Sequence, residues 1–436
     1  MEFECIKIKK GLDIPLSGAP ERHITDARSI SRYAVKPPDV VGFTPRLLVA
    51  EGDSVTAGQP LVADKNDPRL FLPSPVSGQV QAIVRGEKRK LEAVVVERGN
   101  GVVGSADIAN RQLSPESPCW WMIKERPFGT IANPDHTPKG IFVSMRDTNP
   151  IAPDVDYALK GREHELEAGF NALAAIAPLH VVRPEGPHPA GNVGTQIAAI
   201  DPINRGEHVW TVGAQDVANI GRWLLTGEYR PERVISVGGP VAKAPHHYRV
   251  LCGACIDSIS SAQLMNAAYP SMTSDTNSTR IISGSVLSGT TVAPDGFLGM
   301  YDQQITFIEE GNRHELMGWL MPGLRKFSFS RTFISGMLPK SLHLPLGTFQ
   351  FNTNLHGGRR PLMFTGDMER VFPFDIYPLQ LIKACIIGDV ELQEKLGIYE
   401  VEPEDFALCE FIDPSKTDIQ SIIREALEVL RKEATA

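Results

Sequence analysis

One pattern constrains the fold of this chain most. Between residues 140 and 237, short apolar runs alternate with amphipathic segments. Four apolar runs have the length of buried strands: Gly140–Met145, Leu179–Val182, Val209–Val212 and Arg233–Val237. Between them, Gly161–Ile176 and Gln215–Leu225 have helical periodicity, and Gly227 is placed to end the second helix. Strands that alternate with helices form mainly parallel sheets. The sequence therefore predicts a Rossmann-like α/β domain.

The loop expected at the carboxyl edge of that sheet is Gly186–Ile197, GPHPAGNVGTQI, with three glycines and two prolines. Open α/β sheets bind ligands at this edge, and glycine lets backbone N–H groups approach a ligand. The loop has no lysine, no Walker spacing and no GxGxxG pattern. Two interpretations stay open, a Gly/Pro surface turn or a ligand loop. In the second, the contacting residues are Gly186, His188, Gly191, Asn192 and Gly194.

Length, composition and charge limit the class of protein. A chain of 436 residues is too long for one compact core, and 42% hydrophobic with 22% charged residues is typical of a globular protein. The net charge is −8 and the basic residues are scattered, so we expect no nucleic-acid partner. No apolar run approaches the roughly 18 residues that cross a bilayer, and the first residues do not resemble a secretory signal. We therefore expect a cytoplasmic protein.

The six cysteines, at positions 5, 119, 252, 255, 385 and 409, are too dispersed for a disulfide framework and are expected as free thiols. Cys252 and Cys255 form a single CxxC, which supplies only two of the ligands that a metal site needs. We interpret both as small buried residues rather than as a redox or metal pair. His188, His246 and His247 have no third ligand at a suitable spacing, so no metal site is predicted.

The segment Arg46–Val84 contains short β-rich runs separated by EGD, AGQP and SPVSG turns and predicts a small β-sandwich. Its pattern resembles the biotinyl and lipoyl carrier domains, which modify a lysine at a hairpin tip. Lys65 lies near that position, but more residues separate it from Pro73 than in a carrier hairpin. We interpret Lys65 as an ordinary hairpin residue, with lipoylation as the less favoured alternative.

The remaining segments complete an α/β multidomain architecture. Runs at Arg249–Ile259, Arg280–Val286 and Gln304–Ile308 suggest a β-grasp module, and Phe327–Gly358 reads as a long ordered connection. Three helices are expected near the carboxyl end: Pro378–Ile387, Val390–Leu396 and Asp418–Lys432. The expected parts are a strand and irregular arm (1–34), a biotinyl/lipoyl-like β domain (35–105), a Rossmann-like domain (106–245), a β-grasp (SLBB-like) domain (246–335), and a connection with a C-terminal helical domain (336–436).

Five separate stretches carry a resemblance to one family: IKIKKGLDIPLSGAP (Ile6–Pro20), DTNPIAPD (Asp147–Asp154), GPHPAGNVGTQI (Gly186–Ile197), RIISGSVLSG (Arg280–Gly289) and GDMERVFPFDIYP (Gly366–Pro378). Together they resemble the A subunits of Na⁺-translocating NADH:quinone oxidoreductases. The resemblance implies a peripheral subunit, on the cytoplasmic side of the inner membrane, of a six-subunit sodium pump that passes electrons from NADH to ubiquinone. It implies the other subunits, including membrane-spanning ones, as partners.

The family is also similar to the flavin-binding subunit of complex I and to the C subunit of Rnf-type complexes, which carry a flavin loop and cluster cysteines. No flavin loop is evident here, and Asp413 stands where a cysteine would complete a pattern that begins at Cys409. Four thiolates hold an iron-sulfur cluster. We therefore expect no flavin, no cluster and no other tightly bound cofactor, and an isolated chain that does not oxidise NADH.

By implication of the family, the subunit takes part in quinone binding or in the step from semiquinone to quinol. The alternatives are an assembly scaffold without a ligand of its own and, less favoured, an NADH-oxidising flavoprotein. A quinone pocket needs aromatic walls and hydrogen-bond donors. Phe43, Trp121, Phe128 and His136 could meet at a domain junction and supply both, although aromatic residues that only seal a domain interface are the favoured interpretation. His188 and Asn192 are the competing donors.

Overall fold

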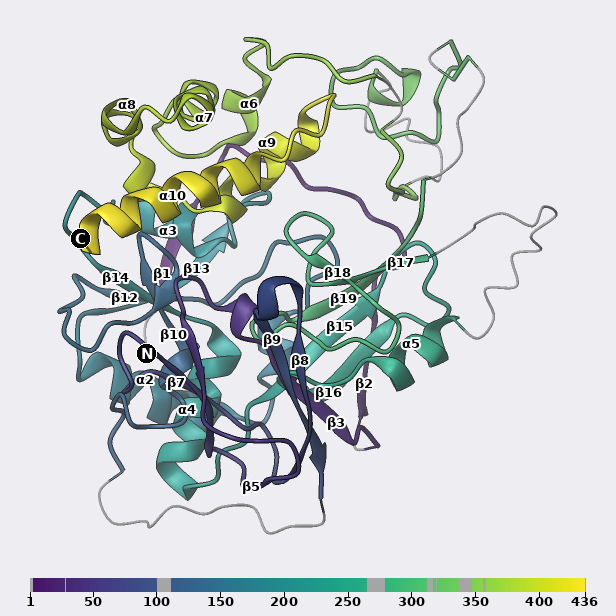
Figure 1. Cartoon of the computed structure of the whole chain (residues 1–436). Helices are drawn as coiled ribbons and strands as arrows, with labels where there is room; N and C mark the ends of the chain where they lie inside the picture. The colour runs from purple at the N-terminus through teal and green to yellow at the C-terminus, as the bar shows by residue number, and fades with distance from the viewer. Residues whose placement is uncertain are drawn as a thin grey trace.

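The computed structural model describes residues 3–27, 29–99, 111–264, 279–311, 317–318, 320–337, 347–355 and 358–435. The described residues form a small β-sandwich, two larger sheets of six strands each and a layer of C-terminal helices (Figure 1). The domain boundary expected between residues 105 and 106 lies outside the described residues. The architecture is thus a multidomain one with mixed α/β sheets.

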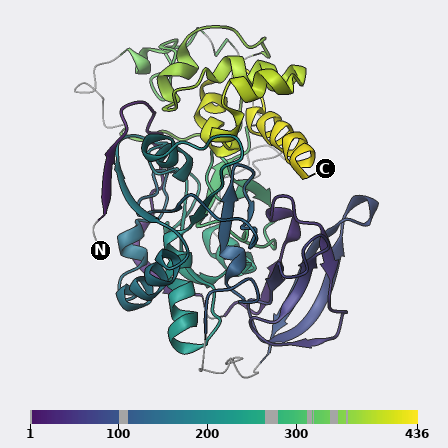
Figure 2. The same ribbon diagram turned by 90° about the vertical axis from the view of Figure 1, so that its left-hand side faces the viewer.

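The N-terminal sandwich consists of two antiparallel sheets, which lie at the lower right of Figure 2. One contains, in order, β3 (Arg32–Val35), β9 (Leu91–Arg98), β8 (Gly78–Arg85) and β5 (Ser54–Val55), and the other β4 (Pro45–Leu47), β6 (Pro60–Asp64) and β7 (Phe71–Pro73). Leu61, Leu72 and Val94 are fully buried between them. Lys65 is exposed in the β6–β7 hairpin, where its backbone N–H donates to the carbonyl of Thr44 at 2.8 Å.

The first six-stranded sheet combines parallel and antiparallel strands. Its order is β1 (Glu4–Lys7), β13 (Leu179–Glu185), β12 (Ile141–Ser144), β14 (Val209–Val212), β10 (Ile123–Arg126) and β11 (Thr130–Ile131). The first four strands are parallel, whereas β10 is antiparallel to β14 and to β11. Three of the predicted strands therefore lie side by side as expected, whereas β10, with charged residues in its sequence, is not among the predicted strands.

The prediction that Arg233–Val237 is the fourth strand of this sheet is wrong. This run forms β15 (Glu232–Gly238), a central strand of the second six-stranded sheet. The order there is β18 (Thr290–Val292), β17 (Thr279–Ser283), β19 (Gln304–Glu309), β15, β16 (His246–Leu251) and β2 (Glu21–Asp26). β15 is buried along its whole length, and a fully buried strand fits the central position of either sheet. Its short connection to β16 selects the second sheet, because two sequential strands pair as an antiparallel hairpin.

Two further expectations change with this sheet. The arm expected to be irregular within residues 1–34 contributes β2, which pairs in parallel with β16. The sheet also takes β15 and β2 from outside the range 246–335 that was expected to form a β-grasp module. Contacts across the sequence, not a local module, therefore define this second sheet.

The helices of the first sheet lie on both of its sides. They are α1 (Val155–Ala158), α2 (Glu163–Ala174), α3 (Val193–Ile200) and α4 (Ala214–Thr226), and α5 (Asp257–Leu264) belongs to the second sheet. α4 ends as predicted at Gly227, which has the left-handed φ of 75°. α2 and α4 pack against each other through Gly169 and Gly221, where a Cβ at Gly221 would lie 1.7 Å from the carbonyl oxygen of Glu165.

The C-terminal helices form a separate layer with its own core, at the top of Figures 1 and 2. They are α6 (Asp367–Val371), α7 (Pro378–Ile387), α8 (Val390–Lys395), α9 (Ala407–Ile412) and α10 (Ile419–Thr435), with 3₁₀ turns at Ile398–Glu400 and Pro403–Phe406. α7, α8 and α10 match the predicted helices within a few residues. The apolar face of α10 is buried at Ile419, Ile423, Leu427 and Leu430. None of the helices in the described ranges is long and apolar enough to cross a membrane.

Candidate functional site

The predicted ligand loop is mostly buried and ends in a helix, since α3 begins at Val193. His188 is only 2% exposed, and its Nδ1 lies 3.2 Å from Oγ1 of Thr148. Its backbone N–H donates to Oδ1 of Asp13 at 3.0 Å. Burial lowers the pKa of His188 to about 4, so the imidazole is neutral at pH 7.

Each glycine of this loop lies against another segment of the chain. A Cβ at Gly186 would lie 2.2 Å from the carbonyl oxygen of Ile8, and one at Gly191 would lie 2.5 Å from the backbone nitrogen of Thr148. Real Cβ atoms do not approach backbone atoms so closely, so these positions require glycine. The packing of neighbouring segments thus accounts for the glycines without a ligand.

The amino end of α3 faces a carboxylate of the C-terminal domain. A Cβ at Gly194 would lie 2.6 Å from Oδ2 of Asp405, and Nδ2 of Asn192 donates to the carbonyl of Glu404 at 3.4 Å. A helix amino end attracts an anion. Here an internal carboxylate takes the place that a phosphate would take in a nucleotide-binding loop. Ligand binding at Gly186–Asn192 stays a prediction.

Asp405 is itself part of a buried charged group. Nη2 of Arg126 lies 3.6 Å from Oδ2 of Asp405, and Nη1 lies 3.4 Å from Oε2 of Glu402. Burial raises the pKa of Asp405 to about 7, against the attraction of Arg126. The group joins β10 to the 3₁₀ turn before α9 and so attaches the C-terminal domain to the first sheet.

The four residues predicted to line a quinone pocket have different surroundings. Trp121 is buried in the main core, where its Nε1–H donates to the hydroxyl of Tyr229 at 3.0 Å, and Phe43 packs against the same core. Phe128 packs with Tyr399 in the C-terminal core, with ring centroids 6.4 Å apart. His136 lies 2.8 Å from Glu125. Trp121 and Phe43 thus share the main core, whereas Phe128 lies in the C-terminal core and His136 beside Glu125. Quinone binding by these four residues stays a prediction.

A groove of about 1790 Å³ lies between the second sheet, residues 325–333 and 348–355, and the C-terminal helices. Four half-buried phenylalanines form its aromatic wall: Phe327, Phe349, Phe351 and Phe411. The ring of Phe327 lies 5.7 Å from those of Phe351 and Phe411, measured between centroids. Phe349 and Asn352 are held by single bridges to Leu16 and Glu309. Chain segments far apart in sequence therefore assemble the wall.

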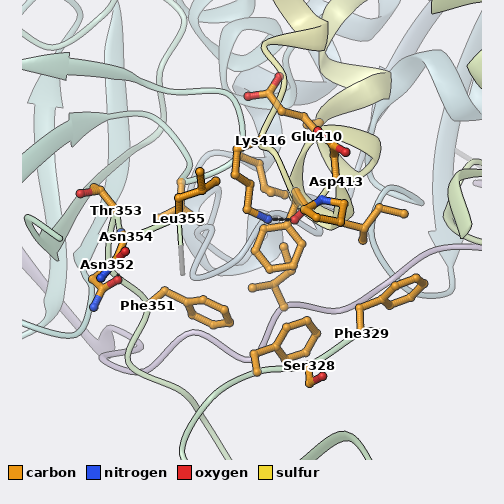
Figure 3. A pocket seen from close by; sticks show the side chains of 18 of the residues that line it. Ser328, Phe329, Phe351, Asn352, Thr353, Asn354, Leu355, Glu410, Asp413 and Lys416 are labelled. Atoms are coloured by element: carbon orange, nitrogen blue, oxygen red, sulfur yellow. Dashed lines mark hydrogen bonds between the residues drawn. The ribbon is translucent and has the colours of Figure 1, made fainter. Parts of the chain in front are cut away.

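Polar groups line the same groove. Figure 3 shows the side chains of Phe351 and Lys416 directed into the same space. Nζ of Lys416 donates to the carbonyl of Phe411 and lies 4.7 Å from the centroid of the Phe411 ring. Burial raises the pKa of Glu410, whose Oε2 accepts a hydrogen bond from Nε2 of Gln420 at 3.2 Å. The groove thus combines aromatic faces, a lysine side chain whose pKa burial lowers and a carboxyl group whose pKa burial raises.

Three family models match successive parts of the chain. Residues 6–99 match the family model of the NqrA N-terminal barrel-sandwich hybrid domain, residues 107–185 and 177–229 that of the NqrA second alpha/beta domain, and residues 234–293 that of the NQRA C-terminal domain. Among the A subunits of Na⁺-translocating NADH-quinone reductases, that of Rhodopirellula baltica is 37% identical over 462 residues, which cover 98% of both chains. Those of Pasteurella multocida and of Neisseria meningitidis serogroup B are each 36% identical, over 98% of this chain and all of theirs.

The chain belongs to the NqrA family, the A subunits of the Na⁺-translocating NADH-quinone reductases.

Membership of the NqrA family confirms the resemblance that the sequence motifs carry. The chain is therefore a component of a respiratory enzyme complex that couples electron transport to sodium translocation, and the other subunits of that complex are its partners. The N-terminal sandwich is the barrel-sandwich hybrid domain of the family.

The cysteines of this NqrA family member have structural surroundings. Cys252 and Cys255 are buried in the main core and are not bonded to each other, in agreement with their interpretation as small core residues. Burial raises the pKa of Cys252 to about 12. Cys409 is fully buried within α9, and Oδ2 of Asp413 accepts from Oγ1 of Thr417 at 2.8 Å.

Sequence reasoning missed the aromatic groove. Its one local signal is density, since five of the 18 phenylalanines fall between Phe327 and Phe351. They have no helical or strand period, so the stretch predicts only a connection. Residues 338–346 and 356–357 of that connection lie outside the described residues.

Proposed function

We propose that this chain acts in the quinone step of the complex and that the aromatic groove binds the ring of ubiquinone. In this step a semiquinone anion takes up one electron and two protons and becomes the quinol. NADH supplies the electron through the other subunits, so the chain needs no flavin, cluster or other tightly bound cofactor of its own. The observation that carries the proposal is the convergence of four phenylalanine rings with Lys416 and Glu410 in one groove.

The chemistry of the groove suits a quinone. A quinone ring is planar and apolar, and its two carbonyl oxygens only accept hydrogen bonds. Phenylalanine rings about 5.7 Å apart offer faces and edges for stacking. Burial lowers the pKa of Lys416, but the Nζ group carries more than one N–H in either protonation state and so keeps a donor for a quinone oxygen beyond its bond to Phe411. The raised pKa of Glu410 has the direction that a proton donor to a reduced quinone needs.

The groove is also large enough for more than the ring. Pockets for small molecules measure roughly 300–1,000 Å³, and this groove measures about 1790 Å³. The additional space accommodates part of an isoprenoid tail or a segment of another subunit that closes the groove.

Equilibrium dialysis of a short-chain ubiquinone analogue against the purified chain tests the proposal. We expect Phe351→Ala and Phe411→Ala each to weaken binding by about tenfold, because each removes one aromatic face worth roughly 1–1.5 kcal/mol. Phe364→Ala is the matched control. Phe364 is 65% exposed on the same domain, contacts Lys383 and does not line the groove.

Two further sets of variants distinguish the groove from the two sites expected from sequence. A loss confined to Phe128→Ala and His136→Ala places the quinone at the domain junction, and a loss confined to His188→Ala places it at the central loop. Either result, or affinity unchanged in both groove variants, contradicts the groove assignment.

The alternative function, an assembly scaffold without a ligand, is favoured by a different observation. Several large apolar side chains in the last third of the chain are more than half exposed: Met317, Leu320, Met321, Met337, Met363 and Ile387. Such a concentration is typical of a surface that contacts another protein. Absence of quinone binding to the folded chain, together with loss of complex assembly in Leu320→Ser and Met321→Ser, supports this alternative.

A further inference from the structure

Three potential metal ligands meet beside the first sheet, outside the groove. They are Glu125 on β10, His136 after β11 and His208 just before β14. Nδ1 of His136 lies 2.8 Å and Nδ1 of His208 lies 3.1 Å from the same oxygen, Oε1 of Glu125. The ligand atoms of all three residues lie within 4.8 Å of one another. Donors 83 positions apart in sequence, from Glu125 to His208, therefore point to one place.

The second oxygen of Glu125 is already held by the protein. Oε2 accepts from Nε1–H of Trp210 at 3.0 Å and from the backbone N–H of Asn133 at 3.1 Å. Glu125 is only 5% exposed, so these bonds fix its orientation. Hydrogen bonds of this kind orient metal-binding carboxylates in known sites. Oε1 is thereby directed at the two imidazoles.

The two imidazole rings are arranged in parallel. Their centroids lie 3.9 Å apart, with 28° between the ring planes. Nδ1 of His208 is buried and makes no hydrogen bond, although Oε1 of Glu125 is close. A buried nitrogen without a hydrogen-bond partner, beside a carboxylate oxygen, is a feature that a metal ion would explain.

We propose that Glu125, His136 and His208 form a binding site for a divalent transition-metal ion of the zinc type. Two imidazoles and one carboxylate are a ligand set that Zn²⁺ commonly takes, at about 2.0–2.2 Å from each donor. Both histidines are partly exposed, with 36% and 26% of their side chains accessible, so an ion can enter and a water molecule can complete the coordination. Nε2 of His136 lies 3.4 Å from Nδ2 of Asn133 on the side of the ring away from Glu125.

The site would fix a contact between domains. Asp135, next to His136, forms a two-bond ion pair with Arg69 of the N-terminal sandwich, at 2.6 and 3.0 Å. A metal ion that joins β10, the segment around His136 and the start of β14 would hold Asp135 in position for that pair. Metal binding would thus stabilise the attachment of the barrel-sandwich domain.

Titration of the chelator-treated full chain with Zn²⁺ tests the proposal. We expect one Zn²⁺ per wild-type chain, and affinity lower by at least about tenfold in His136→Gln and in His208→Gln. His180→Gln is the matched control, because Nδ1 of His180 also lies 2.8 Å from a carboxylate, Oε1 of Glu4, but belongs to no group of three potential metal ligands in the part of the chain that the structure describes. Its affinity should equal that of the wild type.

The absorption spectrum of bound Co²⁺ is a second test, because it reports the coordination geometry. Co²⁺ bound to the wild type should give the visible absorption bands of a tetrahedral site, and Glu125→Gln, which keeps an acceptor for Trp210, should lose them. Circular dichroism of each metal-free variant checks that it is folded. Zn²⁺ affinity of the double variant His136→Gln/His208→Gln equal to that of the wild type, or an equal loss in His180→Gln, would overturn the proposal and leave two histidines that share a carboxylate.

Discussion

Individual residues show where the interpretation of the sequence differs from the structure. The composition of Gly186–Ile197 leaves two interpretations open, a surface turn and a ligand loop at the sheet edge. The structure gives the same residues another purpose, since Gly186 and Gly191 admit backbone from other segments and Gly194 admits the carboxylate of Asp405. The sequence shows that glycines stand at these positions, and the structure shows which neighbours require them.

The buried imidazole of His188 predicts a specific pH dependence. Its pKa is about 4 in the folded chain, against an ordinary value of 6.5, so the unfolded chain binds more protons between these pH values. The free energy of unfolding should therefore fall as the pH falls from about 6.5 to 4, by up to about 3 kcal/mol from this residue. Urea unfolding of the wild type and of His188→Gln across this range measures the difference in slope.

The pKa of Asp405 is also shifted, so the pH dependence of the wild type alone does not isolate the contribution of His188. The pKa of Asp405 is raised to about 7, so its contribution to stability decreases as the pH rises from about 4 to 7, opposite to that of His188. The difference between wild type and variant cancels this contribution. Parallel pH profiles for the two proteins would show that His188 is not buried as a neutral group.

Secondary-structure elements are predictable where the pattern is local. α2, α4, α7 and α10 begin and end close to the predicted positions, because helical periodicity and Gly227 are visible in sequence. The prediction for β15 names the wrong sheet, since an apolar run does not specify its pairing partner. The sequence does not predict β10 as a strand, because Glu125 and Arg126 are charged residues of the kind found in exposed segments, although both are buried here.

The close crossing of α2 and α4 predicts that a single methyl group is disruptive. Gly221→Ala would place a Cβ 1.7 Å from the backbone oxygen of Glu165, so the helices must separate. We expect the free energy of unfolding to fall by about 2–3 kcal/mol, since this overpacking outweighs the roughly 1 kcal/mol by which alanine favours the helix. Chemical denaturation measures the change.

Gly347→Ala is the control for that experiment. No atom of the described residues lies within 4 Å of a Cβ built at Gly347, so its substitution should change stability by no more than about 0.5 kcal/mol. Equal stability of the two variants would show that α2 and α4 do not cross at the glycines.

At the scale of the whole molecule, the family and the division into a β-rich amino end, α/β centre and helical carboxyl end are accessible from sequence motifs. The sites are not. The groove joins Phe327 and Phe351 to Phe411 on α9, and the histidine pair joins His136 to His208. Neither set has a spacing that a motif could record, because tertiary packing alone brings its members together.

Steady-state kinetics of the assembled complex test the central claim, that the aromatic groove of this subunit serves quinone reduction. The Michaelis constant for ubiquinone should rise about tenfold in complexes with Phe351→Ala or Phe411→Ala, while electron transfer from NADH to an artificial acceptor that bypasses quinone stays unchanged. Complexes with Phe364→Ala should match the wild type in both assays. An unchanged Michaelis constant for ubiquinone in fully assembled complexes with either groove variant would contradict the claim.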